Sequence, residues 1–187
     1  MRSVLNFLGA VLLTIGLAAC ASVPDATAYF NSTPNRPYTL ASGDRLRVLV
    51  FGQDQLSNSY DVDSTGSIEM PLIGSVHAKG LTTHGLERVI ADKLRDGYIR
   101  DPKVAVEVQA YRPFFILGEV TTAGQYPYIN GMTVENAIAV AGGYTPRASH
   151  GAVIMTRIID GRSYTGTVPT TEPVHPGDSI SVRERLF

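Results

Sequence analysis

A six-residue pattern occurs twice in the chain and constrains its fold more than any other feature. Both copies begin with Gly-Asp and continue with alternating polar and apolar residues, GDRLRV at 43–48 and GDSISV at 177–182. Glycine permits a tight turn, and the aspartate can accept hydrogen bonds from nearby backbone N–H groups. The alternation then places every second residue on one face of a strand. The two copies predict two small β-rich units, unless they are a coincidence between two common turn types.

The residues after the first copy predict several strands and one long helix. We expect strands at 45–51, 67–70, 74–78 and 104–108, with a polar loop at 53–60. Thr82 or Thr83 should cap a helix that ends near Asp96. The apolar residues of this helix recur at helical spacing and form one stripe, which consists of Leu86, Val89, Ile90 and Leu94.

The residues from Arg112 onward predict a second unit with the order strand, turn, helix, hairpin and strand. Its strands are expected at 113–120, 152–159 and 163–168 and in the second Gly-Asp copy, with a turn at 121–126. Thr133 should cap a short helix, which the glycine pair at 142–143 ends by adopting positive φ. This order is typical of a β-grasp-like module, so the chain is predicted to be α+β.

The first 19 residues are typical of a secretory signal peptide. A positive charge at Arg2 is followed by an acid-free, almost wholly apolar run at 4–17. Cys20 follows directly and is the single cysteine of the chain, which excludes an intramolecular disulfide. We interpret 1–19 as a signal peptide and 20–37, which is small, polar and proline-containing, as a tether.

The sequence LAAC at 17–20 resembles the lipobox of bacterial lipoproteins. In that family the cysteine is acylated and becomes the first residue after cleavage, which makes Cys20 the predicted lipidation site. The residues Ala21 and Ser22 resemble those that direct lipoproteins to the outer membrane. The alternative is an ordinary signal peptide with an incidental cysteine.

Composition and charge argue against several classes of function. Lys and Arg number 16 against 17 Asp and Glu, and no basic run occurs, so we expect no nucleic-acid partner. The sequence contains no phosphate-binding loop and no dinucleotide-binding fingerprint. The four histidines, at 77, 84, 150 and 175, lack the spacing of a metal site. We therefore expect no metal, no cofactor and no catalytic residues.

Two groups of motifs resemble the outer-membrane polysaccharide export proteins. YTLASGDRLRVLVFG at 38–52, GSIEMPLIG at 66–74 and DPKV at 101–104 resemble the polysaccharide biosynthesis/export domain. GEV at 118–120, AGQY at 123–126, AGGY at 141–144 and PGD at 176–178 resemble the SLBB (soluble-ligand-binding β-grasp) module. The resemblance implies a polysaccharide-export domain at 38–110 followed by one SLBB module at 111–187.

The resemblance also implies what such a protein does. Members form homo-oligomeric rings on the periplasmic face of the outer membrane, and polysaccharide passes through the ring without chemical change. They work with an inner-membrane polysaccharide co-polymerase that is often linked to a tyrosine kinase. The alternative function is that of a monomeric periplasmic lipoprotein that binds or processes carbohydrate. The size of the solubilised protein, a large ring or a monomer, separates the two.

The two Gly-Asp pairs, Gly43 with Asp44 and Gly177 with Asp178, are expected to be structural turn residues. If their role is structural, replacing either aspartate with alanine should lower the free energy of unfolding by roughly 0.5–2 kcal/mol. That range is the one for a lost hydrogen bond between a side chain and the backbone.

Three aromatic residues in the segment YRPFF are candidates for contact with another molecule. They are Tyr111, Phe114 and Phe115. Since adjacent residues of a strand face opposite sides, one phenylalanine should face the core and the other a neighbouring subunit. Stacking on a sugar is the alternative.

Five residues, 183–187, follow the last predicted strand. Export proteins of the best-known type continue into an amphipathic helix that crosses the outer membrane, and they carry more than one SLBB module. Five helical residues rise about 7.5 Å against a hydrocarbon core of about 30 Å. The expectation is a periplasmic collar whose pore is completed by a separate outer-membrane component.

Overall fold

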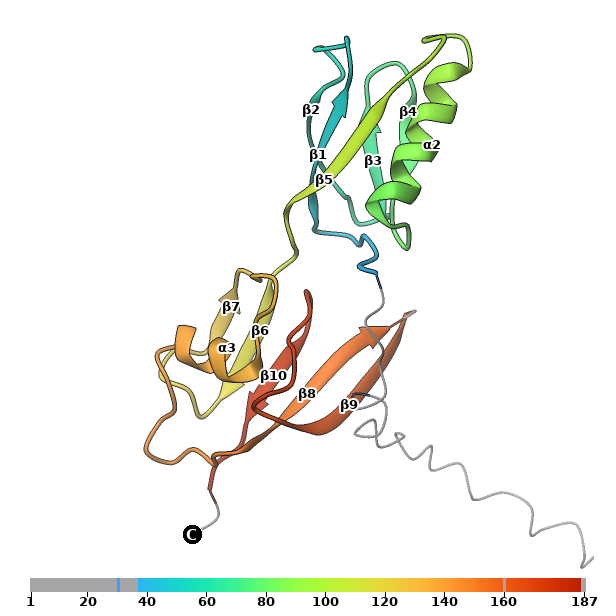
Figure 1. Cartoon of the computed structure of the whole chain (residues 1–187). Helices are drawn as coiled ribbons and strands as arrows, with labels where there is room; N and C mark the ends of the chain where they lie inside the picture. The colour runs from blue at the N-terminus through green and yellow to red at the C-terminus, as the bar shows by residue number, and fades with distance from the viewer. Residues whose placement is uncertain (1–29, 31–36, 160, 186–187) are drawn as a thin grey trace, which may run out of the picture.

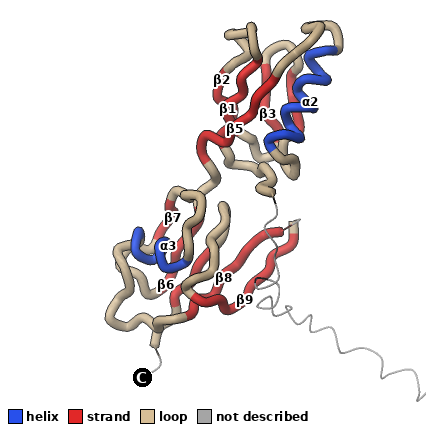
Figure 2. Tube along the Cα trace, in the orientation of Figure 1, coloured by secondary structure: helices blue, strands red, loops and turns tan. Residues whose placement is uncertain are grey.

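The computed structural model of the protein describes Phe30 and residues 37–159 and 161–185. These residues form two α+β domains that lie end to end and are joined by the loop 111–113 (Figure 1). Figure 2 shows helix and strand in both domains and a loop between them. The predicted α+β architecture with two units is confirmed.

The first domain packs a three-stranded sheet, a hairpin and one helix around a single core. Its elements are β1 (Arg45–Val50), β2 (Asn58–Asp61), β3 (Ser67–Met70), β4 (Gly74–His77), α2 (Thr83–Arg95) and β5 (Val104–Ala110). The sheet has the order β2-β1-β5 with antiparallel neighbours, and β3 pairs with β4. The alternating residues Leu46, Val48 and Val50 of the central strand are buried, as the sequence pattern predicts.

Helix α2 forms where the apolar stripe predicts it. The Oγ1 of Thr82 accepts a hydrogen bond from the Gly85 N–H at 3.0 Å, which caps the first turn. Leu86, Ile90 and Leu94 are fully buried in the core of the first domain. The amphipathic face therefore holds the helix against the sheet.

The second domain is a five-stranded sheet with a short helix on one face. Its elements are β6 (Phe114–Gly118), β7 (Gly124–Tyr126), α3 (Val134–Val140), β8 (Ala152–Ile159), β9 (Arg162–Pro169) and β10 (Ser179–Val182). The strand order is β7-β6-β10-β8-β9, so the second Gly-Asp copy supplies the central strand, parallel to β6 and antiparallel to β8. Ile138 of α3 packs in the same core as Phe114 and Ile116 of β6, and Thr133 caps the helix as predicted.

Two short strands lie where the sequence pattern predicts a loop and a turn. β2 occupies the end of the expected loop 53–60 and pairs with β1, and β7 occupies the end of the expected turn 121–126 and pairs with β6. Both are edge strands without a fully buried side chain, so the apolar alternation of a half-buried strand is missing. The loop and turn assignments are therefore wrong for these residues. The other predicted elements agree with the structure within two residues at each end.

Candidate functional site

The repeated Gly-Asp pattern folds into the same turn in both domains. The N–H groups of Asp44 and Asp178 each donate to the carbonyl oxygen three residues earlier, at 3.1 Å in both turns. The N–H of that earlier residue donates back to the aspartate Oδ2, at 2.9 Å in the first domain and 2.7 Å in the second. Gly43 and Gly177 have φ of 93° and 85°, a conformation that favours glycine. The sequence repeat is thus a structural repeat that leads into β1 and β10.

Asp44 connects the first domain to the loop between the domains. Its buried carboxylate accepts hydrogen bonds from the Tyr38 hydroxyl at 2.6 Å and from the backbone N–H of Arg112 at 2.9 Å. The Nη1 of Arg112 donates to the Tyr38 hydroxyl at 3.0 Å and lies 3.9 Å from Asp44 Oδ2. One network therefore holds the start of β1 and the interdomain loop together.

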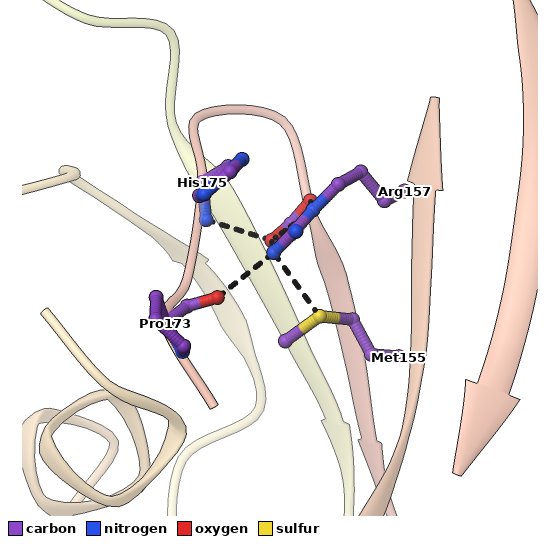
Figure 3. Close-up of polar contacts among 5 residues, drawn as sticks. Met155, Arg157, Pro173 and His175 are labelled. Carbon is purple, nitrogen blue, oxygen red and sulfur yellow. Dashed lines mark hydrogen bonds and ion pairs between the residues drawn. The ribbon is translucent and has the colours of Figure 1, made fainter. Parts of the chain in front are cut away.

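Asp178, at the same place in the second turn, pairs with the buried Arg157. Figure 3 shows Arg157 together with Met155, Pro173 and His175. The Nε of Arg157 donates to Asp178 Oδ1 at 2.9 Å and Nη2 donates to Oδ2 at 2.8 Å. Nη2 also donates to the Pro173 carbonyl at 2.8 Å and lies 3.4 Å from the sulfur of Met155. The two side chains are 5% and 1% exposed, so the paired hydrogen bonds compensate both charges away from water.

Arg112 lies between the two turns. A Cβ added at Gly177 would lie 2.6 Å from Arg112 Nε, and a Cβ added at Gly43 would lie 3.4 Å from Arg112 Cβ. The Gly177 N–H also donates to the carbonyl of Pro113 at 3.1 Å. Two turns that are far apart in the sequence therefore meet on the loop 111–113. This role of Arg112 is not predicted by the sequence pattern, because it depends on that long-range meeting of the two turns.

Three tyrosines form a chain of edge-to-face contacts across the junction. The ring centroids of Tyr38 and Tyr111 are 4.9 Å apart and those of Tyr111 and Tyr128 are 5.3 Å apart, with interplanar angles of 86° and 83°. Burial, together with the hydrogen bond to Asp44, raises the pKa of Tyr38. All three residues are half-buried, so this tyrosine chain packs the junction and also presents ring surface to solvent.

The two adjacent phenylalanines of the expected contact segment face opposite sides of β6. Phe114 is fully buried, and its ring stacks on Tyr126 with centroids 6.0 Å apart. Phe114 is therefore a core residue and cannot contact a sugar or a neighbouring subunit. Phe115 is 40% exposed on the other face. Of the three contact candidates, Tyr111 and Phe115 stay accessible.

The face of the second sheet that points away from α3 carries an apolar strip. This outer strip consists of Phe115, Leu117, Ile154 and Ile158. Leu117 and Ile158 are 51% and 65% exposed. Leu117 of β6 and Ile154 of β8 both pair with Ser181 of β10, so the apolar side chains of these two strands flank the serine on the central strand. A row of exposed apolar side chains of this kind is typical of a surface that another molecule covers.

The described part of the chain provides surfaces that could contact another molecule and a fixed junction between the two domains. Within this part of the chain, no group of three or more His, Cys, Asp and Glu side chains could hold a metal ion. No described helix has the length and apolar character needed to cross a bilayer. Cys20 lies outside the described residues, so its acylation stays a prediction.

Comparison with protein families gives two matches in succession. A family described as "Polysaccharide biosynthesis/export protein" matches residues 32–109, and the SLBB domain matches residues 113–168. The first match contains the Gly-Asp turn of β1. The loop 111–113, which contacts both turns, begins between the two matches.

Similarity to curated proteins covers about two thirds of the chain. The exopolysaccharide production protein ExoF of Rhizobium meliloti (strain 1021) is 35% identical over 126 residues, which are 61% of this chain and 30% of ExoF. The polysialic acid transport protein KpsD of Escherichia coli is 25% identical over 126 residues, which are 66% of this chain and 23% of KpsD. The chain thus spans less than a third of the length of either relative.

Proposed function

Because the chain belongs to the family of polysaccharide export proteins, we propose that it is a subunit of a machine that carries a capsular or extracellular polysaccharide across the cell envelope. The observation that carries the proposal is the succession of the export domain and the SLBB domain. The relatives named for exopolysaccharide production and polysialic acid transport agree with this role. The subunit holds a path open for the polymer and does not change it chemically.

The proposed machine is a ring of identical subunits on the periplasmic face of the outer membrane. The outer strip supports this part of the proposal, because copies that bury it against a neighbour would remove exposed apolar surface from water. The half-buried tyrosine chain offers ring surface to a passing sugar. An inner-membrane co-polymerase linked to a tyrosine kinase and a separate outer-membrane pore component complete the proposed pathway.

Loss of the gene tests the export role directly. A deletion strain should show little polysaccharide on its surface while polymer accumulates inside the envelope, and the wild-type gene should restore export. The measurement is polysaccharide in the surface and cell-associated fractions. Unchanged surface polysaccharide, or loss of synthesis without any accumulation, would contradict an export role.

We predict that Cys20→Ser prevents acylation and leaves the precursor uncleaved or the protein released from the outer membrane. The change removes the thiol that acylation requires, so a palmitate analogue should label the wild-type protein and not the variant. Ser22→Ala serves as a control, because it alters the same segment and keeps the thiol. Label that persists in Cys20→Ser would exclude this cysteine as the anchor.

We predict that Leu117→Glu breaks the ring. A charge in the outer strip must be desolvated at a subunit interface but stays hydrated in the monomer. The variant should elute as a monomer, with a free energy of unfolding within about 0.5 kcal/mol of the wild type. Val140→Glu is the matched control, since Val140 is 52% exposed on α3, at the opposite face of the sheet. A ring of unchanged mass in Leu117→Glu would exclude the outer strip as the interface.

A further inference from the structure

Phe30 precedes the first domain in the sequence but packs into the second domain. Its side chain is 4% exposed and belongs to the apolar core that contains Phe114 and Ile180. The first domain begins its own described structure only at residue 37. Phe30 therefore contacts the second domain, although the whole first domain lies between them in the sequence.

The ring of Phe30 lies against the buried ion pair of the second domain. The Cζ of Arg157 is 5.2 Å from the centroid of the Phe30 ring, which is within the range of a cation–π contact. The same guanidinium is fixed by Asp178 and by the Pro173 carbonyl. An aromatic ring suits this position, because a flat guanidinium held by its edge leaves its face for stacking.

We propose that Phe30 docks the segment ahead of the first domain onto the second domain at Arg157, and so ties the membrane anchor to the second domain. The anchor part rests on the proposed acylation of Cys20. Phe30 lies ten positions after Cys20, a stretch that can span at most about 36 Å, whereas Tyr38 lies 18 positions after Cys20, a stretch that can span about 65 Å. Docking at Phe30 therefore nearly halves the length of the tether and holds the SLBB domain close to the membrane.

The docking is tested on a soluble form that begins at Ala21, which contains no cysteine and cannot be acylated. A 4-fluorophenylalanine placed at position 30 reports burial by ¹⁹F NMR with little change in shape. Its signal should be broadened several-fold less by a soluble paramagnetic agent than the same probe at Phe51, which is 69% exposed. Arg157→Lys should shift the signal of position 30 and leave that of position 51 in place.

Two outcomes of this experiment would overturn the docking. One is equal broadening at positions 30 and 51, which would place Phe30 in solvent. The other is protection that disappears on dilution, which would mean that Phe30 docks onto a neighbouring copy and not onto its own second domain. Neither outcome depends on acylation or on polysaccharide export, so the result stands apart from the proposed function.

The tether is tested on the acylated protein in lipid nanodiscs. With Cys20 acylated, a cysteine introduced at Ser163 of the second domain or at Gln53 of the first is the single reactive thiol. Energy transfer from a dye at position 163 to labelled lipid should exceed that from position 53, and Phe30→Ala should reduce it. Equal transfer from the two positions, or no effect of Phe30→Ala, would refute the short tether. Protein that fails to attach would refute the anchor and leave the docking result intact.

Discussion

Replacing Asp178 with alanine should lower the free energy of unfolding by about 3–5 kcal/mol, the range for removing one partner of a buried ion pair. The change leaves the guanidinium of Arg157 buried without its carboxylate and also removes the hydrogen bond to the His175 N–H. This loss exceeds the roughly 0.5–2 kcal/mol expected from the turn alone. Urea unfolding followed by circular dichroism measures it, provided that the denaturant dependence stays unchanged.

Asp44→Ala is the matched control, because it removes the corresponding carboxylate from the same turn of the first domain. The charge of Arg112 is 3.9 Å away and its side chain is 26% exposed, so it stays partly hydrated. We expect a loss of only about 1–3 kcal/mol there. Combining Asp178→Ala with Arg157→Met removes both buried charges and should recover part of the loss. Equal losses in the two aspartate variants would contradict the role assigned to Arg157.

The elements that could be predicted from the sequence are those with a buried face. Helix α2 has an apolar stripe and a threonine cap, and the central strands β1 and β10 have strict alternation after a Gly-Asp turn. The edge strands β2 and β7 have no fully buried side chain, so their residues carry no such pattern and form strands only because a neighbour pairs with them. Pairing of that kind depends on residues that lie elsewhere in the sequence.

The candidate site could be predicted only in part. The sequence repeat points to both aspartates but not to their different partners. Arg157 could have been found, because it shares the inward face of β8 with Val153 and Met155, and an inward arginine needs a carboxylate. Arg112 has no comparable signal, since its position between the turns depends on how the two domains meet.

Replacing Gly177 with alanine should disturb the junction of the domains and reduce polysaccharide export. Alanine at a φ of 85° is strained by about 1–2 kcal/mol. Its Cβ would in addition lie 2.6 Å from the Nε of Arg112, so the guanidinium must leave its place beside Tyr38. The free energy of unfolding and the surface polysaccharide of a complemented deletion strain are the two measurements. Gly151→Ala is the control, because Gly151 has a φ of 94° and no atom within 4 Å of an added Cβ.

Making Gly177→Ala in an Arg112→Ala variant separates the steric clash with the arginine side chain from the backbone strain of alanine at positive φ. Without the arginine side chain an added Cβ at position 177 has room, so Gly177→Ala should become as mild as Gly151→Ala, within about 0.5 kcal/mol. Arg112→Ala itself should reduce export while each domain keeps its fold. Export by a ring requires the two domains to keep a fixed relative orientation, and Arg112 contacts both of them. If the two glycine variants behave alike in both backgrounds, Arg112 does not couple the domains, and the junction is a passive linker.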